Sequence, residues 1–194
     1  MKKINYFIIL FIIISCSNKS QHNPTFKKNH QEFYFVDLKG DSIKIDNNLK
    51  AKVFFMLDPE CPLCKSYSKT INKIHTKYKH AIDFYGIFSQ KVFLKEKAYS
   101  FIQKNQLDMT LIADTNHILV NFLDARVTPE CFLTDENLEI IYRGLIDDWI
   151  KEIGRKGQSI NNKYLENSIN SHLNAESIET KHTKAIGCII QRSK

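Results

Sequence analysis

Two cysteines three positions apart, Cys61 and Cys64, are the residues of this chain best suited to do chemistry. They lie in the motif Asp58-Pro59-Glu60-Cys61-Pro62-Leu63-Cys64, between an apolar run at 53–57 and a polar stretch at 65–78. Two thiols at this spacing can close a disulfide if both lie on one face of a helix. Such a pair exchanges two electrons with a partner thiol or disulfide. We therefore interpret the motif as a redox dithiol.

The flanking segments predict how the dithiol is held. Residues 53–57 are continuously apolar, as in a buried strand. Four later residues are spaced four, three and four apart, on one face of a helix: Tyr67, Ile71, Ile74 and Tyr78. Pro62 suits the first helical position, so Cys61 falls at the helix N-terminus, where free amides and the positive dipole end favour a thiolate. Such a setting lowers a cysteine pKa from about 8.5 to roughly 3.5–7.5. Glu60 is expected to offset part of this effect by raising the pKa.

A zinc site is the competing interpretation of a Cys-x-x-Cys motif. It needs a second pair of ligands with similar spacing, or two histidines. The downstream cysteines, Cys131 and Cys188, stand alone in the sequence. We therefore predict no metal and no other cofactor at Cys61 and Cys64.

The first residues are expected to lie outside the fold. Lys2 and Lys3 precede the apolar run 6–14, which is short for a transmembrane helix but suits the core of a signal peptide. Ile13-Ile14-Ser15-Cys16 resembles a bacterial lipoprotein cleavage site. The resemblance implies cleavage before Cys16, a lipid on Cys16, and a chain anchored to a membrane on the periplasmic side of the cell envelope. Ser17 favours the outer membrane over the inner one.

Length and charge limit the number of domains and the class of partner that the remaining chain can have. After a signal peptide at 1–15 and a polar tether at 16–31, residues 32–194 suffice for one domain with a C-terminal tail at 175–194. The formal net charge of the whole chain is +7, but its lysines are scattered and form no arginine-rich stripe with interleaved aromatics. We predict no nucleic-acid partner.

Strand-like and helix-like segments alternate along the domain. Expected strands cover 33–38, 42–46, 52–57, 81–88, 109–113, 131–134 and 138–143, and expected helices cover 65–78, 92–105, 116–123 and 160–173. The first two strands and the last two have hairpin spacing. This order predicts an α/β fold, with a central mixed sheet flanked by helices on both faces and an N-terminal β-hairpin.

Thr128-Pro129, directly before the expected strand at 131–134, completes a familiar order of motifs. The chain resembles the thioredoxin-like redoxin family (the AhpC/TSA–TlpA-like superfamily), which places a cis proline here, facing the dithiol. Within it the chain is similar to an exported lipoprotein subgroup. The matching segments are 58–63, Thr128-Pro129-Glu130, 142–148 and 183–190.

The resemblance implies a thiol–disulfide oxidoreductase with assigned roles. Cys61 would be the attacking thiol and Cys64 the resolving thiol. Thr128 would present its backbone to an extended partner segment, held so by Pro129. Cys188 is a candidate auxiliary thiol. The implied partners are disulfide-bearing exported proteins, small-molecule disulfides or a membrane-bound reductant.

Three alternatives stay open. Peroxiredoxins share this fold, but their pattern has Pro seven residues and Thr or Ser three residues before the reactive cysteine, where this chain has Phe54 and Asp58. A copper-binding metallochaperone of the Sco type would use the thiolates and a histidine such as His117, although that family resembles a Cys-x-x-x-Cys spacing. The third is a scaffold that has kept the fold and lost turnover.

Cys131 is expected to be a small buried strand residue.

Overall fold

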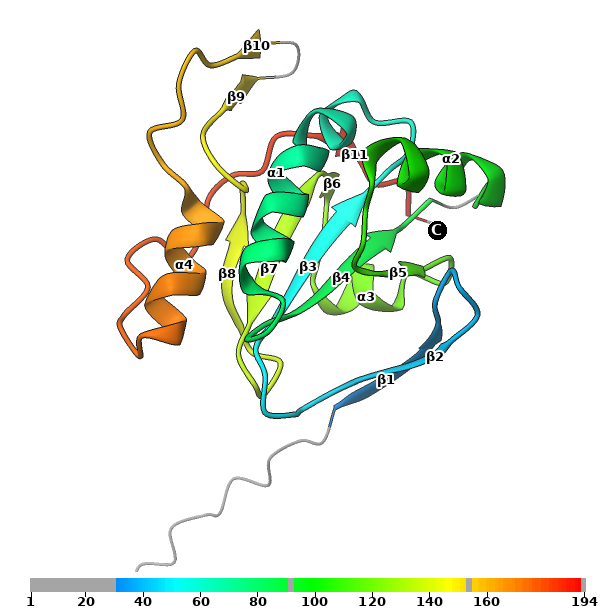
Figure 1. The fold of residues 1–194 in the computed structure, drawn as a ribbon, viewed down its shortest axis with the longest axis horizontal. Coiled ribbons are helices and arrows are strands. Elements are labelled where there is room, and N and C mark those ends of the chain that lie inside the picture. The colour runs from blue at the N-terminus through cyan, green and yellow to red at the C-terminus, as the bar shows by residue number, and fades with distance from the viewer. Residues whose placement is uncertain (1–30, 91–92, 153–154, 193–194) are drawn as a thin grey trace, which may run out of the picture.

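A five-stranded mixed sheet forms the centre of the molecule (Figure 1). The computed structural model describes residues 31–90, 93–152 and 155–192. The strand order is β5-β4-β3-β7-β8, in which β3, β4 and β5 are parallel and β7 is antiparallel to both β3 and β8. The strands are β3 (Lys52–Leu57), β4 (Asp83–Phe88), β5 (Thr110–Ala113), β7 (Glu130–Thr134) and β8 (Ile140–Gly144). This architecture confirms the predicted α/β fold.

The central strand β3 is buried along its whole length because both faces of the sheet are covered. Val53, Phe55 and Leu57 pack into the hydrophobic core on one face. Phe54 and Met56 pack into the core on the other. A strand between two apolar layers is continuously apolar rather than alternating, which explains the pattern read from 53–57.

Helices cover both faces of the sheet. The first face packs against α1 (Pro62–Tyr78), α2 (Lys95–Asn105) and α4 (Tyr164–Leu173). The opposite face packs against α3 (Ile118–Phe122) and the antiparallel hairpin of β1 (Glu32–Val36) and β2 (Ser42–Asp46). None of the helices in the described part of the chain is long and apolar enough to cross a membrane. The predicted signal peptide, the tether and Cys16 lie outside the described residues.

The structure differs from the sequence prediction at element ends and in short strands. The last helix begins at Tyr164 rather than Ile160, because Asp148 Oδ1 accepts the backbone N–H groups of Asn161 and Asn162 and holds them in a loop. Strands of two or three residues show no periodicity, so the prediction lacks β6 (Val127–Thr128), β9 (Ile150–Glu152), β10 (Arg155–Lys156) and β11 (Cys188–Ile189).

Candidate functional site

The dithiol lies where the central strand ends and α1 begins. Cys61 is the N-cap residue of α1 and Pro62 occupies the first turn, as predicted. A tight turn leads into the helix: the Cys61 amide donates to the Asp58 carbonyl at 3.1 Å, and the Glu60 amide donates to Asp58 Oδ1 at 2.8 Å. Cys64 follows one turn later, and its Sγ accepts the Asp58 amide at 3.4 Å. Both sulfurs therefore belong to one rigid strand–helix junction.

The two thiols of the motif have opposite pKa shifts. A hydrogen bond from the Cys64 thiol is the largest cause that lowers the pKa of Cys61 to about 5, and the Cys188 thiol and the Leu63 and Cys64 amides act in the same direction. Burial opposes these effects at Cys61 but does not outweigh them. Burial is the main cause that holds the pKa of Cys64 well above its ordinary value. At neutral pH one sulfur is therefore ionised and the other keeps its proton, the arrangement that a nucleophile and a resolving thiol need.

Glu60 has little influence on this balance. Its side chain is 66% exposed and its carboxylate pairs with Lys97 Nζ at 2.6 Å. An exposed and paired carboxylate acts weakly on a neighbouring thiol. The expected rise in the Cys61 pKa is therefore outweighed by the donors at the helix end.

Thr128 and Pro129 lie directly beside the Cys61 sulfur. The Thr128–Pro129 peptide bond is cis, as the family resemblance implied. Cys61 Sγ lies 3.1 Å from the Thr128 carbonyl oxygen, and the Thr128 side chain is buried. The two motifs that the sequence separates by 67 residues thus meet at one place.

The C-terminal tail also reaches this site, which the sequence did not reveal. β11 pairs antiparallel with β6 (Figure 1), and in this register Cys188 is the partner of Thr128. Cys188 Sγ lies 2.7 Å from Cys61 Sγ. When Cys61 is ionised, the Cys188 thiol is the donor in this contact. Burial, followed by the hydrogen bond to Cys61, raises the pKa of Cys188 to about 12. The one sequence signal for this contact was the match of 183–190 to the family.

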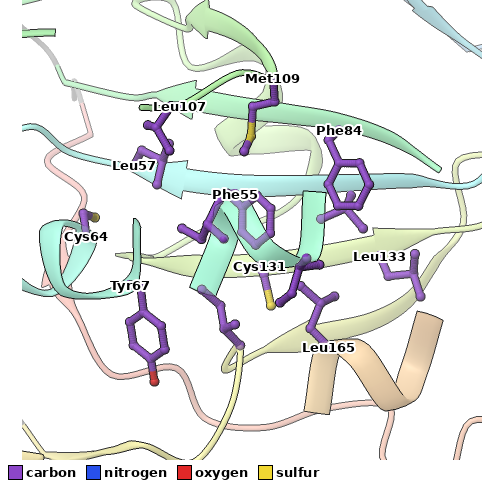
Figure 2. Close-up of a cluster of buried hydrophobic side chains, with 14 of the residues drawn as sticks. Phe55, Leu57, Cys64, Tyr67, Phe84, Leu107, Met109, Cys131, Leu133 and Leu165 are labelled. Carbon is purple, nitrogen blue, oxygen red and sulfur yellow. The ribbon is translucent and has the colours of Figure 1, made fainter. Parts of the chain in front are cut away.

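Cys131 is a buried residue of β7, as predicted, and lies in the core rather than in the dithiol (Figure 2). Its Sγ contacts the Gly144 and Leu145 carbonyl oxygens, each at 3.4 Å. Burial raises its pKa well above the ordinary value. It therefore stays protonated where Cys61 ionises.

Tyr67 ties α1 to the loop after β8. Its hydroxyl donates to Asp147 Oδ1 at 2.8 Å. Its ring packs edge-on against the Trp149 ring, with the two ring centroids 5.7 Å apart. The Ile150 amide donates to the same hydroxyl at 3.4 Å. These contacts lock the helix that presents Cys61. The sequence identified Tyr67 only as a residue of the apolar helix face.

No described histidine belongs with the thiols to a group of three side chains that could hold a metal ion. His117, the candidate copper ligand, is the N-cap residue of α3, and its Nε2 lies 3.0 Å from the Ser89 carbonyl oxygen. His75 and His80 have a spacing that zinc ligands use, but His75 is in the last turn of α1, at the opposite end from Cys61. In residues 31–90, 93–152 and 155–192, no three His, Cys, Asp or Glu side chains are arranged to hold a metal ion.

The two positions that define the peroxiredoxin pattern are occupied by different residue types in this chain. Phe54, where that pattern has its proline, is fully buried in β3. Asp58, where the pattern has Thr or Ser, uses a carboxylate oxygen to cap the turn before Cys61. The hydroxyl of the peroxidase pattern is therefore replaced at this position by an acceptor.

Comparison with known proteins defines the class. Residues 20–143 match the AhpC/TSA family, and the chain belongs to this family. No curated protein matches the chain. Among solved structures, an uncharacterised conserved protein from Geobacillus kaustophilus is similar with a TM-score of 0.74 at 18% identity, over 84% of this chain and 89% of its own.

Two further structures have the same fold. A hypothetical protein from Sinorhizobium meliloti 1021 superposes with a TM-score of 0.71 at 18% identity, over 84% of this chain and 92% of its own. The thioredoxin domain of a thiol-disulfide oxidoreductase from Bacteroides vulgatus has a TM-score of 0.52 at 17% identity, over 59% of this chain and 84% of its own. The fold is therefore thioredoxin-like.

Proposed function

We propose that this protein is a thiol–disulfide oxidoreductase that acts through Cys61 and Cys64 on the disulfides of exported proteins or small molecules. One observation carries the proposal: Cys61 caps α1 with its pKa lowered to about 5, while the pKa of buried Cys64 is raised. Membership of the AhpC/TSA family supports redox chemistry at a cysteine. The similarity to a thiol-disulfide oxidoreductase domain supports the choice of disulfides over peroxides.

The reaction follows from the two pKa values. The Cys61 thiolate attacks one sulfur of a partner disulfide, forms a mixed disulfide and releases the other partner sulfur as a thiol. Cys64 then loses its proton and attacks Cys61, which closes the Cys61–Cys64 disulfide and releases the second partner thiol. Two electrons pass from the dithiol to the partner. A thiol of the reductant, attacking Cys61, reopens the disulfide by the same steps in reverse.

Insulin reduction by dithiothreitol tests this proposal. The purified protein should accelerate precipitation of the insulin B chain, and Cys61→Ser should abolish the acceleration because no thiolate remains at the helix end. Cys131→Ser is the matched control, since it removes a thiol from the core and leaves the site intact. Equal activity of Cys61→Ser and the unaltered protein would refute the proposal.

We propose further that a lipid on Cys16 anchors the protein on the periplasmic side of the bacterial envelope. Ser17 favours the outer membrane over the inner membrane as the site of this anchor. The support is the sequence: an apolar run that ends in Ile14-Ser15-Cys16 and is followed by a polar segment. Labelled palmitate should enter the protein in cells, and Cys16→Ser should lose both the label and the membrane fraction. Label retained by Cys16→Ser would contradict the anchor.

A further inference from the structure

The C-terminal tail is held across the dithiol by two anchors. At the first, the Thr183 hydroxyl accepts the Leu145 amide at 2.8 Å and contacts Tyr142 Oη at 2.9 Å, while the Thr183 amide donates to the Arg143 carbonyl at 3.0 Å. At the second, the Ile190 amide donates to the Arg126 carbonyl at 2.9 Å, and the Ile190 side chain is buried in the core. Residues 184–189 span the site between these anchors.

Between the anchors the tail occupies the edge of β6. Cys188 pairs with Thr128 and Ile189 pairs with Val127 in antiparallel register. An extended partner segment that adds to an exposed strand edge makes backbone pairs of this kind. The side chains alternate as such a segment requires: Cys188 is turned toward Cys61, and Ile189 is 82% exposed. The tail thus pairs with β6 in the way that an extended partner segment would.

Gly187 allows this close approach. A Cβ at this residue would lie 2.3 Å from the Thr128 carbonyl oxygen and 3.1 Å from the Thr128 amide nitrogen. These neighbours are backbone atoms of a buried residue and cannot move aside cheaply. A side chain at 187 would therefore lift the tail from β6. At the first anchor Gly144 plays a similar part, since a Cβ there would lie 2.2 Å from the Thr183 carbonyl oxygen.

We propose that residues 184–189, between the two anchors, are a tethered pseudosubstrate: Cys188 exchanges into the Cys61 disulfide, and an external partner binds β6 only after this segment has left. The inference rests on the proposed function and names its substrate class. The partner is an extended segment that carries cysteine and has a residue without a bulky side chain immediately before it, as Gly187 precedes Cys188.

The exchange is balanced without a further oxidant. In the oxidised protein, Cys188 attacks Cys61 of the Cys61–Cys64 disulfide. The Cys61–Cys64 bond breaks as the Cys61–Cys188 bond forms, and the proton of Cys188 passes to Cys64. The number of disulfides is unchanged. The reactive disulfide moves from buried Cys64 to the partly buried Cys188, and attack by Cys64 on Cys61 reverses the step.

Glutathione disulfide tests the exchange in the full chain. In Cys64→Ser, the glutathione that Cys61 captures should be displaced by Cys188, and non-reducing peptide mapping should find Cys61 linked to Cys188. In Cys64→Ser with Cys188→Ser, glutathione should remain on Cys61. Cys64→Ser with Cys131→Ser is the matched control and should still form the Cys61–Cys188 link.

The outcomes separate the two proposals. Glutathione that stays on Cys61 in Cys64→Ser would overturn the pseudosubstrate and leave the oxidoreductase standing, because Cys61 would have reacted. If Cys61 formed neither a glutathione adduct nor a link to Cys188 in all three variants, the proposed function itself would be overturned.

Gly187→Ala tests displacement of the tail with all of the sulfurs kept. If the open site is populated about one tenth of the time, lifting the tail should raise the rate of insulin reduction about tenfold. Leu49→Ala is the control, since that side chain is 96% exposed and belongs to neither the tail nor the dithiol, and its rate should match that of the unaltered protein. An unchanged or lower rate in Gly187→Ala would overturn the displacement.

Discussion

Cys61 and Cys131 are both buried thiols next to backbone carbonyl groups, yet their chemistry is opposite. Cys61 is 2% exposed and Cys131 is fully buried. Cys61 lies 3.1 Å from one carbonyl oxygen, and Cys131 lies 3.4 Å from each of two. The pKa of Cys61 is lowered to about 5, whereas the pKa of Cys131 is well above its ordinary value.

The difference lies in the donors. Cys61 stands at the start of α1, where the Leu63 and Cys64 amides point at its sulfur and two thiols can donate to it. Cys131 sits inside a strand whose amides are used by the sheet, so carbonyl oxygens are its polar neighbours. Burial penalises both thiolates, and only at Cys61 do facing donors compensate for it, namely the Cys64 and Cys188 thiols and the amides of the helix end. A buried cysteine becomes a nucleophile through the groups that face it, not through its depth.

The largest expected effect is in alkylation. At pH 7 a thiol with a pKa of about 5 is almost wholly ionised, and an ordinary thiol with a pKa of about 8.5 is ionised to about 3%, so reduced Cys61 should present roughly 30 times as much reactive thiolate to iodoacetamide as an ordinary thiol. Cys131 should remain unmodified until the protein is unfolded. Because the thiolate is the reactive form, the Cys61 rate should fall as the pH drops through about 5.

Mass spectrometry of tryptic peptides can follow both residues in one sample. Protein unfolded in urea supplies the control, since both cysteines should then react at similar rates. If the alkylation rate of Cys61 in the folded protein had its pH midpoint near 9, Cys61 would not differ from Cys131 in the pKa of its thiol as described above.

Cys131→Ala should show a smaller effect, and on stability alone. Removing a buried sulfur should lower the free energy of unfolding by about 1–2 kcal/mol, because the core around β7 is closely packed. The rate of insulin reduction should not change. Urea denaturation and the insulin assay measure the two quantities separately. Lost activity with unaltered stability would place Cys131 in the redox site.

The smallest effect is expected for Glu60→Gln. The carboxylate is exposed and paired with Lys97, so its removal should shift the pH midpoint of Cys61 alkylation by less than about half a unit. Lys97→Gln is the matched control, because it leaves the carboxylate without its partner and should move the midpoint slightly upward. A downward shift of more than one unit in Glu60→Gln would show that the acid, and not the helix end alone, sets the reactivity.

Much of the site is local in the sequence and was predictable there. The apolar run at 53–57, the Pro62 helix start and the spacing of Cys61 and Cys64 depend on residues that are neighbours along the chain. Helix periodicity and N-terminal signals report such features directly. The N-terminal hairpin was predictable for the same reason.

Only the tertiary structure decided what lies opposite the dithiol. Cys188 is 127 residues from Cys61, and its two-residue strand has no periodicity to detect. Its position depends on Gly187 fitting against Thr128 and on the anchors at Thr183 and Ile190, which exist only when the strands of the sheet are paired. Sequence determines which cysteine stands at a helix N-terminus, because the strand–helix junction around Cys61 and Cys64 is local. Folding determines which sulfur meets it, because that depends on segments that lie far apart in the sequence.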